Sequence, residues 1–150
     1  MTTTTTEATS RSNEIRVVEE FFAAFHAMDL DRALSMLSDD VVYQNVPFPA
    51  DRGKPAVERT LRGFGRVMTG FDVTMKNIAA NGSVVLTERV DVLQGRFVDF
   101  ELWVCGTFEV KDGKITLWRD YFDLATAAAQ LVTGPIRKVL GTGRRERAAH

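Results

Sequence analysis

The chain has 150 residues, of which 45% are hydrophobic and 26% are charged, and its formal net charge is -1 at pH 7. These values are typical of one globular domain that buries most of its apolar surface on folding. A near-neutral charge argues against nucleic acid as the main partner, because phosphate binding requires a basic excess. The single cysteine, Cys105, excludes an intramolecular disulfide, and no apolar run approaches the roughly 18 residues of a membrane helix. We therefore expect a soluble, cytoplasmic, single-domain protein that binds neither nucleic acid nor membranes.

Both ends of the chain differ in composition from its centre. Residues 1–11 include five consecutive threonines and lack the charged and apolar regions of a signal peptide, so a disordered tail is predicted there. Residues 142–150 are rich in arginine and are predicted to be a flexible end. A single folded domain is expected to span residues 12–141.

Apolar residues recur at helical spacing in three stretches of the N-terminal half. The predicted helices run from Ser12 or Asn13 to about Met28, from Asp29 or Asp31 over a short distance, and from Pro55 to Met68. Near the C-terminus, residues 124–140 show helical patches that Gly134 and Pro135 are expected to interrupt.

Strand-like segments occupy most of the remaining chain. A short strand is predicted over residues 41–45, and longer ones over residues 71–79, 86–93, 97–110 and 115–122. The pairs Asn81-Gly82, Gln94-Gly95 and Asp112-Gly113 separate the long strands and favour hairpin turns. Consecutive antiparallel strands preceded by helices predict an α+β fold, in which a curved, mixed but mainly antiparallel sheet holds three to four helices on its concave side.

Charged residues stand on the apolar faces of two of these strands. Side chains alternate along a strand, which places Arg89 and Asp91 on the same face. Asp120 lies between Trp118 and Phe122 on one face of the last strand. If both strands belong to one concave sheet, Arg89, Asp91 and Asp120 converge in an apolar pocket.

Two interpretations of this charge cluster remain open from the residues alone. In the first, burial raises the pKa values of both carboxyl groups and the arginine lowers them, so the pair shares one proton and can serve as general acid and general base. In the second, the cluster is a buried ion-pair network that only ties neighbouring strands together.

Other residue types in the sequence point to fewer kinds of site. Tyr43 and Asn45 share a strand face and could bind a water molecule, although a buried tyrosine and an Asx turn before Pro47 would explain them equally well. The two histidines, His26 and His150, have no ligand cluster near them in the sequence, so no metal is expected. No phosphate-binding glycine loop and no nucleophile elbow is present.

Three segments, residues 43–47, 86–93 and 118–123, resemble the limonene-1,2-epoxide hydrolase family in their residues, their order and the lengths between them. The resemblance covers roughly residues 13–125, and residues 103–106 and 115–118 are most similar to the mycobacterial branch that acts on steroid and lipid epoxides. It implies a cone-shaped fold like those of nuclear transport factor 2 and ketosteroid isomerase, a homodimer, and no cofactor.

The resemblance also implies roles for individual residues. Asp120 resembles the general base that deprotonates the hydrolytic water, and Tyr43 and Asn45 resemble the residues that hold this water. Asp91 resembles the general acid that protonates the epoxide oxygen, and Arg89 resembles the bridge between the two aspartates. The family's apolar substrate lining corresponds here to Phe22, Phe25, Phe64, Met68, Leu93, Leu102, Val104 and Phe122.

The expected activity is therefore cofactor-independent addition of water to an apolar cyclic or lipid-like epoxide, giving a vicinal diol in one step. Two alternatives stay open, because one fold can host many functions. A proton-transfer isomerase or cyclase would need only one catalytic carboxylate and would leave Arg89 unexplained. A non-catalytic protein that binds a hydrophobic ligand would tolerate the loss of Asp91 or Asp120.

Overall fold

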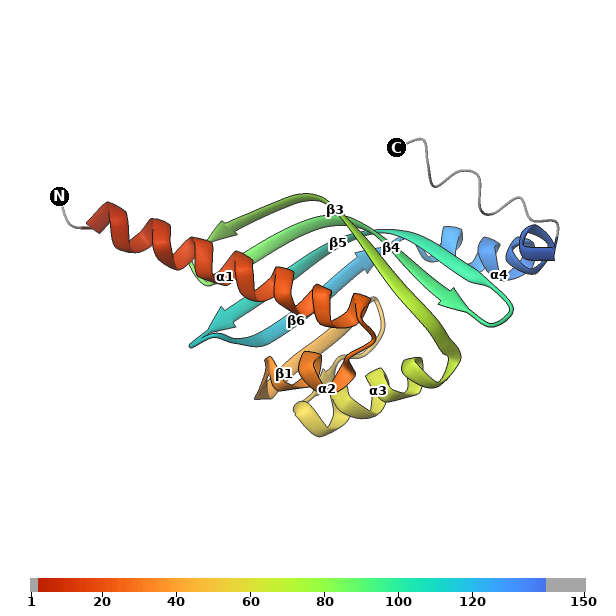
Figure 1. The fold of residues 1–150 in the computed structure, drawn as a ribbon, viewed down its shortest axis with the longest axis horizontal. Coiled ribbons are helices and arrows are strands. Elements are labelled where there is room, and N and C mark those ends of the chain that lie inside the picture. Colours follow the sequence, from red (N-terminus) through yellow and green to blue (C-terminus); the bar gives the residue numbers. More distant parts are fainter. Residues whose placement is uncertain (1–2, 140–150) are drawn as a thin grey trace.

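A computed structural model of the chain describes the backbone of residues 3–139 and the side chains of residues 13–136. Within this range, six strands form one sheet in the order β2-β1-β6-β5-β4-β3, and four helices accompany it (Figure 1). β1 and β6 are parallel, whereas the other neighbouring pairs are antiparallel. The predicted α+β fold with a mixed, mainly antiparallel sheet is confirmed.

The strands are β1 (Leu37–Val46), β2 (Asp51–Arg52), β3 (Met68–Asn81), β4 (Val84–Gly95), β5 (Asp99–Lys111) and β6 (Lys114–Phe122). Every strand that the sequence predicts is present, although β5 begins at Asp99 instead of Phe97, because residues 96–98 form the preceding turn. The predicted Asn-Gly and Asp-Gly hairpin turns place Gly82 and Gly113 at φ values of +59° and +74°, which glycine adopts without steric cost.

The helices are α1 (Thr3–His26), α2 (Leu30–Ser35), α3 (Lys54–Val67) and α4 (Leu124–Val139). α1 begins at Thr3, whereas the sequence predicts a disordered tail up to residue 11. Threonine has only a modest helix propensity, but extending a formed helix costs much less than nucleating a new one. Residues 140–150, which include the predicted flexible end, lie outside the described range. None of the helices within residues 3–139 is long and apolar enough to cross a lipid bilayer.

α4 continues through Gly134 and Pro135, where the sequence predicts an interruption. It lies against the N-terminal part of β5, which extends beyond its pairing with β6. There the Gln130 side chain accepts a hydrogen bond from the Glu101 backbone N–H at 2.8 Å and donates one to the Glu101 carbonyl at 2.7 Å. Gly134 fits this contact because a β-carbon at that position would collide with Val98. Packing on β5 therefore compensates for two residues that weaken an isolated helix.

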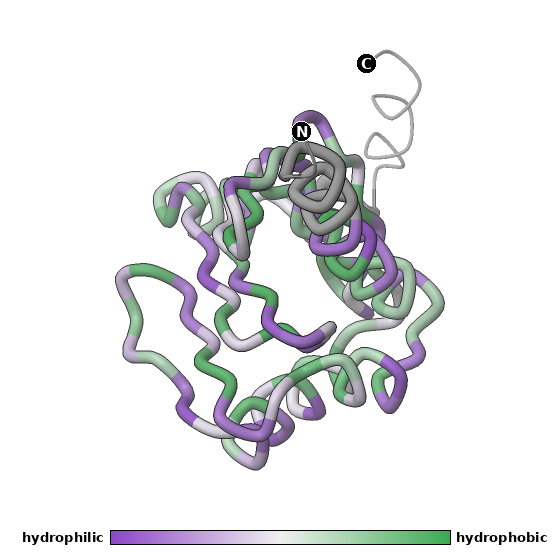
Figure 2. The backbone as a smooth tube through the Cα atoms, turned by 90° about the vertical axis from the view of Figure 1, so that its left-hand side faces the viewer, coloured by the Kyte–Doolittle hydropathy of each residue, from purple (hydrophilic) through white to green (hydrophobic). Residues whose placement is uncertain are grey.

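The core lies between the concave face of the sheet and helices α1, α2 and α3. Figure 2 shows hydrophilic and hydrophobic residues alternating along the strands as they curve around the interior, with α1 on one side. Val18 and Phe21 on α1, Val57 on α3 and Phe108 on β5 have no exposed surface. The ring of Phe21 packs edge-on against those of Phe108 and Trp118, with centroids 6.3 and 5.1 Å away. The same alternation that fills this core also turns the charged cluster inward.

Candidate active site

Four strands bring the predicted catalytic residues together on the concave face of the sheet. In the strand register, Asn45 on β1 lies beside Asp120 on β6, which lies beside Gly106 on β5. Gly106 in turn lies beside Thr87 on β4. Arg89 follows two residues after Thr87 and therefore points to the same face. Segments that are far apart in the sequence thus form one row across the sheet.

Arg89 is the centre of this arrangement and contacts both aspartates. Its Nε donates to Asp91 Oδ1 and Oδ2 at 2.9 and 3.1 Å, and its Nη2 donates to Asp120 Oδ2 at 2.7 Å. Its Nη1 donates to Thr87 Oγ1 at 3.0 Å, and the ring of Phe22 lies over the guanidinium with its centroid 4.6 Å from Cζ. The exposed fractions of Arg89, Asp91 and Asp120 are only 0%, 6% and 5%. The predicted convergence of the three charges is therefore observed.

The two oxygens of Asp120 have different surroundings. Oδ2 accepts hydrogen bonds from Arg89 Nη2 and from Trp118 Nε1, the latter at 2.8 Å. Oδ1 is buried and has no hydrogen-bond partner among the described residues. Buried carboxylate oxygens are almost always hydrogen-bonded in folded proteins. Asp120 therefore offers one strong acceptor on the concave face of the sheet that no described residue uses.

Tyr43 and Asn45 stand next to this acceptor on β1. Asn45 Nδ2 donates to Tyr43 Oη at 2.6 Å, which leaves the Tyr43 hydroxyl hydrogen and the Asn45 amide oxygen for other partners. The Tyr43 ring lies on the Trp118 ring, with centroids 4.2 Å apart. Burial, followed by the negative charge of Asp120, raises the pKa of Tyr43, so its hydroxyl stays protonated at neutral pH. The pair thus provides one donor and one acceptor.

Burial dominates the electrostatics of the charged cluster. It raises the pKa of Asp91 to about 6, against the lowering effect of the Arg89 charge and with a further increase from Asp120. Burial also raises the pKa of Asp120, which Arg89 and the Trp118 indole oppose. Burial lowers the pKa of Arg89, but the two carboxylates outweigh it, so Arg89 keeps its charge. One cation then faces two carboxyl groups, and a single shared proton makes the cluster neutral.

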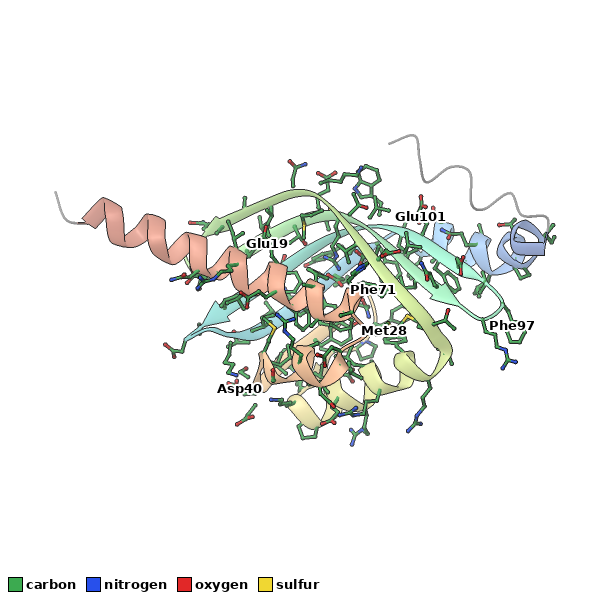
Figure 3. All side chains as sticks on the ribbon, in the orientation of Figure 1. Glu19, Met28, Asp40, Phe71, Phe97 and Glu101 are labelled. Atoms are coloured by element: carbon green, nitrogen blue, oxygen red, sulfur yellow. The ribbon has the colours of Figure 1, made fainter. Side chains whose placement is uncertain are left out.

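An apolar cleft of about 330 Å³ opens between the end of α1, the start of α2, α3 and the start of β3. Met28, in the turn after α1, and Phe71, on β3, mark its position in Figure 3. No residue of the charged cluster lines the cleft, and Phe25 lies between the two, because its ring also packs against Trp118 with centroids 5.7 Å apart. The lining residues are Phe25, Met28, Leu30, Leu61, Arg62, Gly65, Arg66, Met68 and Phe71.

The predicted substrate-lining residues lie in four different places. Phe25 and Met68 line the cleft, whereas Phe22 covers the Arg89 guanidinium. Phe64 does not line the cleft, and 39% of its surface is exposed, because no other described element covers that side of the last turn of α3. The remaining four share the concave strand faces with the charged cluster: Leu93, Leu102, Val104 and Phe122.

Three residues of the cluster are not among those predicted from the sequence. Trp118 and Thr87 stand two residues before Asp120 and Arg89. Strand alternation therefore predicts that they point to the same face of the sheet as these charged residues. Gly106 has a different signal, since a glycine inside a strand often marks a close approach of another group. A β-carbon on Gly106 would collide with Arg89 and lie 2.8 Å from both Asp120 Oδ1 and Thr87 Oγ1.

Among the described residues, no group of three or more His, Cys, Asp or Glu side chains is placed to hold a metal ion. His26 pairs with Asp72, with 2.8 Å between Nδ1 and Oδ1, at the end of α1. The buried charge of the described residues is concentrated in Arg89, Asp91 and Asp120.

Comparisons with known proteins match most of the chain. The family model of the limonene-1,2-epoxide hydrolase catalytic domain matches residues 12–133. Epoxide hydrolase EphG of Mycobacterium tuberculosis is 43% identical over 141 residues, which cover 93% of each chain. The solved structure of an M. tuberculosis LEH-like epoxide hydrolase has a TM-score of 0.80 at 41% identity, covering 87% of this chain and 98% of that one.

A more distant structure shares the fold alone. A protein from Catenulispora acidiphila with a ketosteroid isomerase-like fold has a TM-score of 0.68 at 17% identity, covering 76% of this chain and 90% of its own. It supports the cone-shaped architecture but no activity. The family model and the M. tuberculosis matches span most of the chain at much higher identity. The chain therefore belongs to the limonene-1,2-epoxide hydrolase family, and it is an enzyme of the epoxide hydrolase type.

Proposed function

We propose that the enzyme adds water directly to an epoxide, with Asp120 as the general base and Asp91 as the general acid. The main support is Oδ1 of the buried Asp120, which has no hydrogen-bond partner in the described part of the chain, whereas Oδ2 already accepts two hydrogen bonds. A base needs such a free acceptor within reach of the proton that it removes. Asn45 and Tyr43, beside it on β1, supply the further groups that a bound water requires.

The proposed water makes three hydrogen bonds. It donates to Asp120 Oδ1 and to the Asn45 amide oxygen, and it accepts from the Tyr43 hydroxyl. Its remaining lone pair then points at the epoxide carbon. As the new carbon–oxygen bond forms, Asp120 takes the proton. Holding the water in one orientation makes its attack effectively intramolecular, and this supplies much of the rate enhancement over the reaction between free molecules.

Asp91 completes the reaction at the other end of the epoxide bond. Its pKa of about 6 lets it carry the shared proton of the pair, which it gives to the epoxide oxygen as the carbon–oxygen bond breaks. One water adds across one carbon–oxygen bond, and the product is a vicinal diol. Asp120 gains one proton and Asp91 loses one, and exchange with solvent restores the pair. Nothing is oxidised or reduced, so we expect no cofactor.

The proposed substrates are apolar cyclic or lipid-like epoxides. Six of the residues that line the cleft have apolar side chains, and one of them, Phe25, packs on Trp118, whose indole donates to Asp120. Burial of an apolar substrate body supplies binding free energy in proportion to the area removed from water. Strain in the epoxide ring supplies part of the driving force for opening.

Hydrolysis in oxygen-18 water tests this proposal. The substrates are limonene oxide, cyclohexene oxide and a bulky steroid epoxide. Each is assayed with the wild type, with Asp120→Asn and with the control Asp39→Asn, which changes an exposed carboxylate outside the site. We expect labelled diol from the wild type and the control, and less than a few per cent of that turnover from Asp120→Asn. Single-turnover incorporation of solvent label distinguishes direct attack by water from an aspartyl ester. Full activity of Asp120→Asn would show that Asp120 is not the general base.

We also propose that the enzyme is a homodimer that buries the convex face of the sheet. Leu86, Trp103 and Tyr121 on this face are 53%, 58% and 44% exposed, and a shallow hollow of about 340 Å³ lies beside Leu86 and Tyr121. We propose that a second copy of the chain covers this face. A two-fold axis would bring the same apolar patch of both copies into contact.

Sedimentation of Leu86→Glu tests the dimer. We expect the wild type to sediment as a dimer and Leu86→Glu to shift toward the monomer, because a charge would be buried in the interface. Phe97→Glu is the matched control, since Phe97 is 75% exposed at the β4–β5 turn, away from this face (Figure 3). A monomeric wild type would overturn the proposal.

A further inference from the structure

The Arg89 guanidinium has a third hydrogen-bond partner besides the two aspartates. Its Nη1 donates to Thr87 Oγ1 at 3.0 Å, whereas Nε and Nη2 contact Asp91 and Asp120. Arg89 has no exposed surface and Thr87 is only 4% exposed, so bulk water does not compete for this contact. A buried arginine N–H without an acceptor is costly. Thr87 therefore supplies an acceptor that the buried cation needs at its third nitrogen.

The three partners stand on different sides of the guanidinium. Thr87 and Asp91 flank Arg89 on β4, two residues before and after it, so all three side chains leave the same face of the sheet. Asp120 lies ahead on β6, two strands away. The carboxylates take Nε and Nη2, and without a contact at Nη1 the planar group could turn toward either of them. A contact at the third nitrogen fixes both its plane and its direction.

The Thr87 hydroxyl has a defined orientation. Thr87 lies beside Gly106 in the strand register, and its Oγ1 is 3.5 Å from the Gly106 carbonyl oxygen, which accepts the hydroxyl hydrogen. The hydroxyl oxygen then faces Arg89 with a lone pair. A β-carbon on Gly106 would lie 2.8 Å from Thr87 Oγ1, so the absence of a side chain there leaves room for the hydroxyl.

We propose that Thr87 is a positioning residue, whose hydroxyl holds the Arg89 guanidinium so that it contacts Asp91 and Asp120 at the same time. Thr87 has no part in the proton transfers and acts only through Arg89. Because it is neutral, it fixes the cation without changing the balance of one cation, two carboxyl groups and one shared proton. This inference rests on the proposed function, because it assumes that both aspartates must be held for catalysis.

Two substitutions separate the hydroxyl of Thr87 from its bulk. Thr87→Val keeps the shape and removes the hydroxyl, whereas Thr87→Ser keeps the hydroxyl and removes the methyl group. If the hydroxyl positions Arg89, kcat should fall by roughly tenfold in Thr87→Val, with little change in KM, and stay near the wild-type value in Thr87→Ser. Packing alone predicts the opposite order, because only Thr87→Ser leaves a cavity. Thr74→Val is the control, since Thr74 is exposed and pairs with Val90, which points to the other face of the sheet.

The pH profile is a second readout. The charge of Arg89 and its hydrogen bond lower the pKa of Asp120, against the larger effect of burial. A guanidinium that Thr87 no longer holds lowers this pKa less, so in Thr87→Val the acidic limb of the kcat profile should move to higher pH. Tyr43 also faces Asp120, but its pKa is raised, so its hydroxyl keeps its proton throughout. Thr87→Ser and Thr74→Val should keep the wild-type limb.

Carbon-13 NMR titration of the aspartate carboxyl groups tests the positioning without a substrate. The signal that is lost in Asp120→Asn identifies Asp120. A higher pKa of Asp120 in Thr87→Val than in the wild type and Thr87→Ser, in an enzyme that hydrolyses no epoxide, would support the inference and overturn the proposed reaction. Wild-type kcat, acidic limb and Asp120 titration in Thr87→Val would overturn the inference and leave the reaction standing. A larger loss of kcat in Thr87→Ser than in Thr87→Val would overturn the inference as well.

Discussion

Arg89 Nη2 contacts Asp120 Oδ2 at 2.7 Å although the two residues lie on β4 and β6, with β5 between them. Neighbouring strands are about 4.8 Å apart, so the arginine side chain spans roughly 10 Å of sheet. Its path crosses Gly106 on β5, where a β-carbon would collide with the guanidinium. One glycine in the central strand therefore decides whether the two aspartates can share one cation.

Gly106→Ala should disrupt the cluster while leaving the rest of the sheet intact. The added methyl forces Arg89 away from Asp120, and such overpacking typically costs about 1–3 kcal/mol of unfolding free energy. We expect diol formation to fall by at least roughly tenfold, because a small misplacement of reacting groups has a large effect on rate. Urea unfolding and kcat are the measurements. Gly63→Ala is the control, since a β-carbon at Gly63 meets nothing within 4 Å, and it should keep full activity.

Arg89→Ala should lower both stability and activity. It leaves two buried carboxyl groups without their cation, which typically costs about 3–5 kcal/mol. Protonation relieves part of this cost, so the loss of unfolding free energy should be larger at about pH 8 than at about pH 5. Chemical denaturation at both pH values measures it. An unchanged free energy of unfolding would mean that water, and not Arg89, balances the carboxylates.

The pH profile of kcat/KM should be bell-shaped, because the reaction needs one protonated and one ionised aspartate. Asp91 has a pKa of about 6, so kcat/KM should fall on the alkaline side as this acid loses its proton. On the acidic side it should fall as Asp120 takes up a second proton, and both limbs belong to the coupled pair. Steady-state rates from about pH 5 to about pH 9 give the profile. A level plateau above pH 7 would contradict the role of Asp91 as the acid.

The same group makes stability depend on pH. The pKa of Asp91 is raised from 3.8 to about 6 by folding, so the native state binds its proton more tightly than the unfolded chain does. This contribution is fully present below the unfolded pKa and is lost as the pH rises through about 6. The unfolding free energy of the wild type should therefore fall across this window, and Asp91→Asn should remove that part of the slope. Thermal or urea unfolding at several pH values measures the difference.

Trp118→Phe should change the base without emptying the core. The phenyl ring keeps much of the packing, but the hydrogen bond from Nε1 to Asp120 Oδ2 at 2.8 Å is lost. That bond stabilises the ionised form, so its loss should raise the pKa of Asp120 and move the acidic limb of the profile to higher pH. Trp103→Phe, on the exposed convex face, should leave the profile unchanged. A shift in both variants would point to a general change in the sheet.

Local rules determined a large part of the structure. Strand alternation predicted that Arg89 and Asp91 share a face, and the Asn81-Gly82 pair marked the hairpin that leads into β4. These features depend on residues a few positions apart, so backbone geometry and turn chemistry are enough to predict them.

Only the tertiary structure decided which segments meet. Asn45 lies beside Asp120 because β1 joins the sheet parallel to β6, and the wall of the cleft combines α1, α2, α3 and β3. Packing also turned Phe64 toward solvent and carried α4 through Pro135. These outcomes depend on contacts between distant segments, whose free energies no local pattern contains. The sequence alone determined which residues could do the chemistry, and long-range packing decided which of them share a pocket.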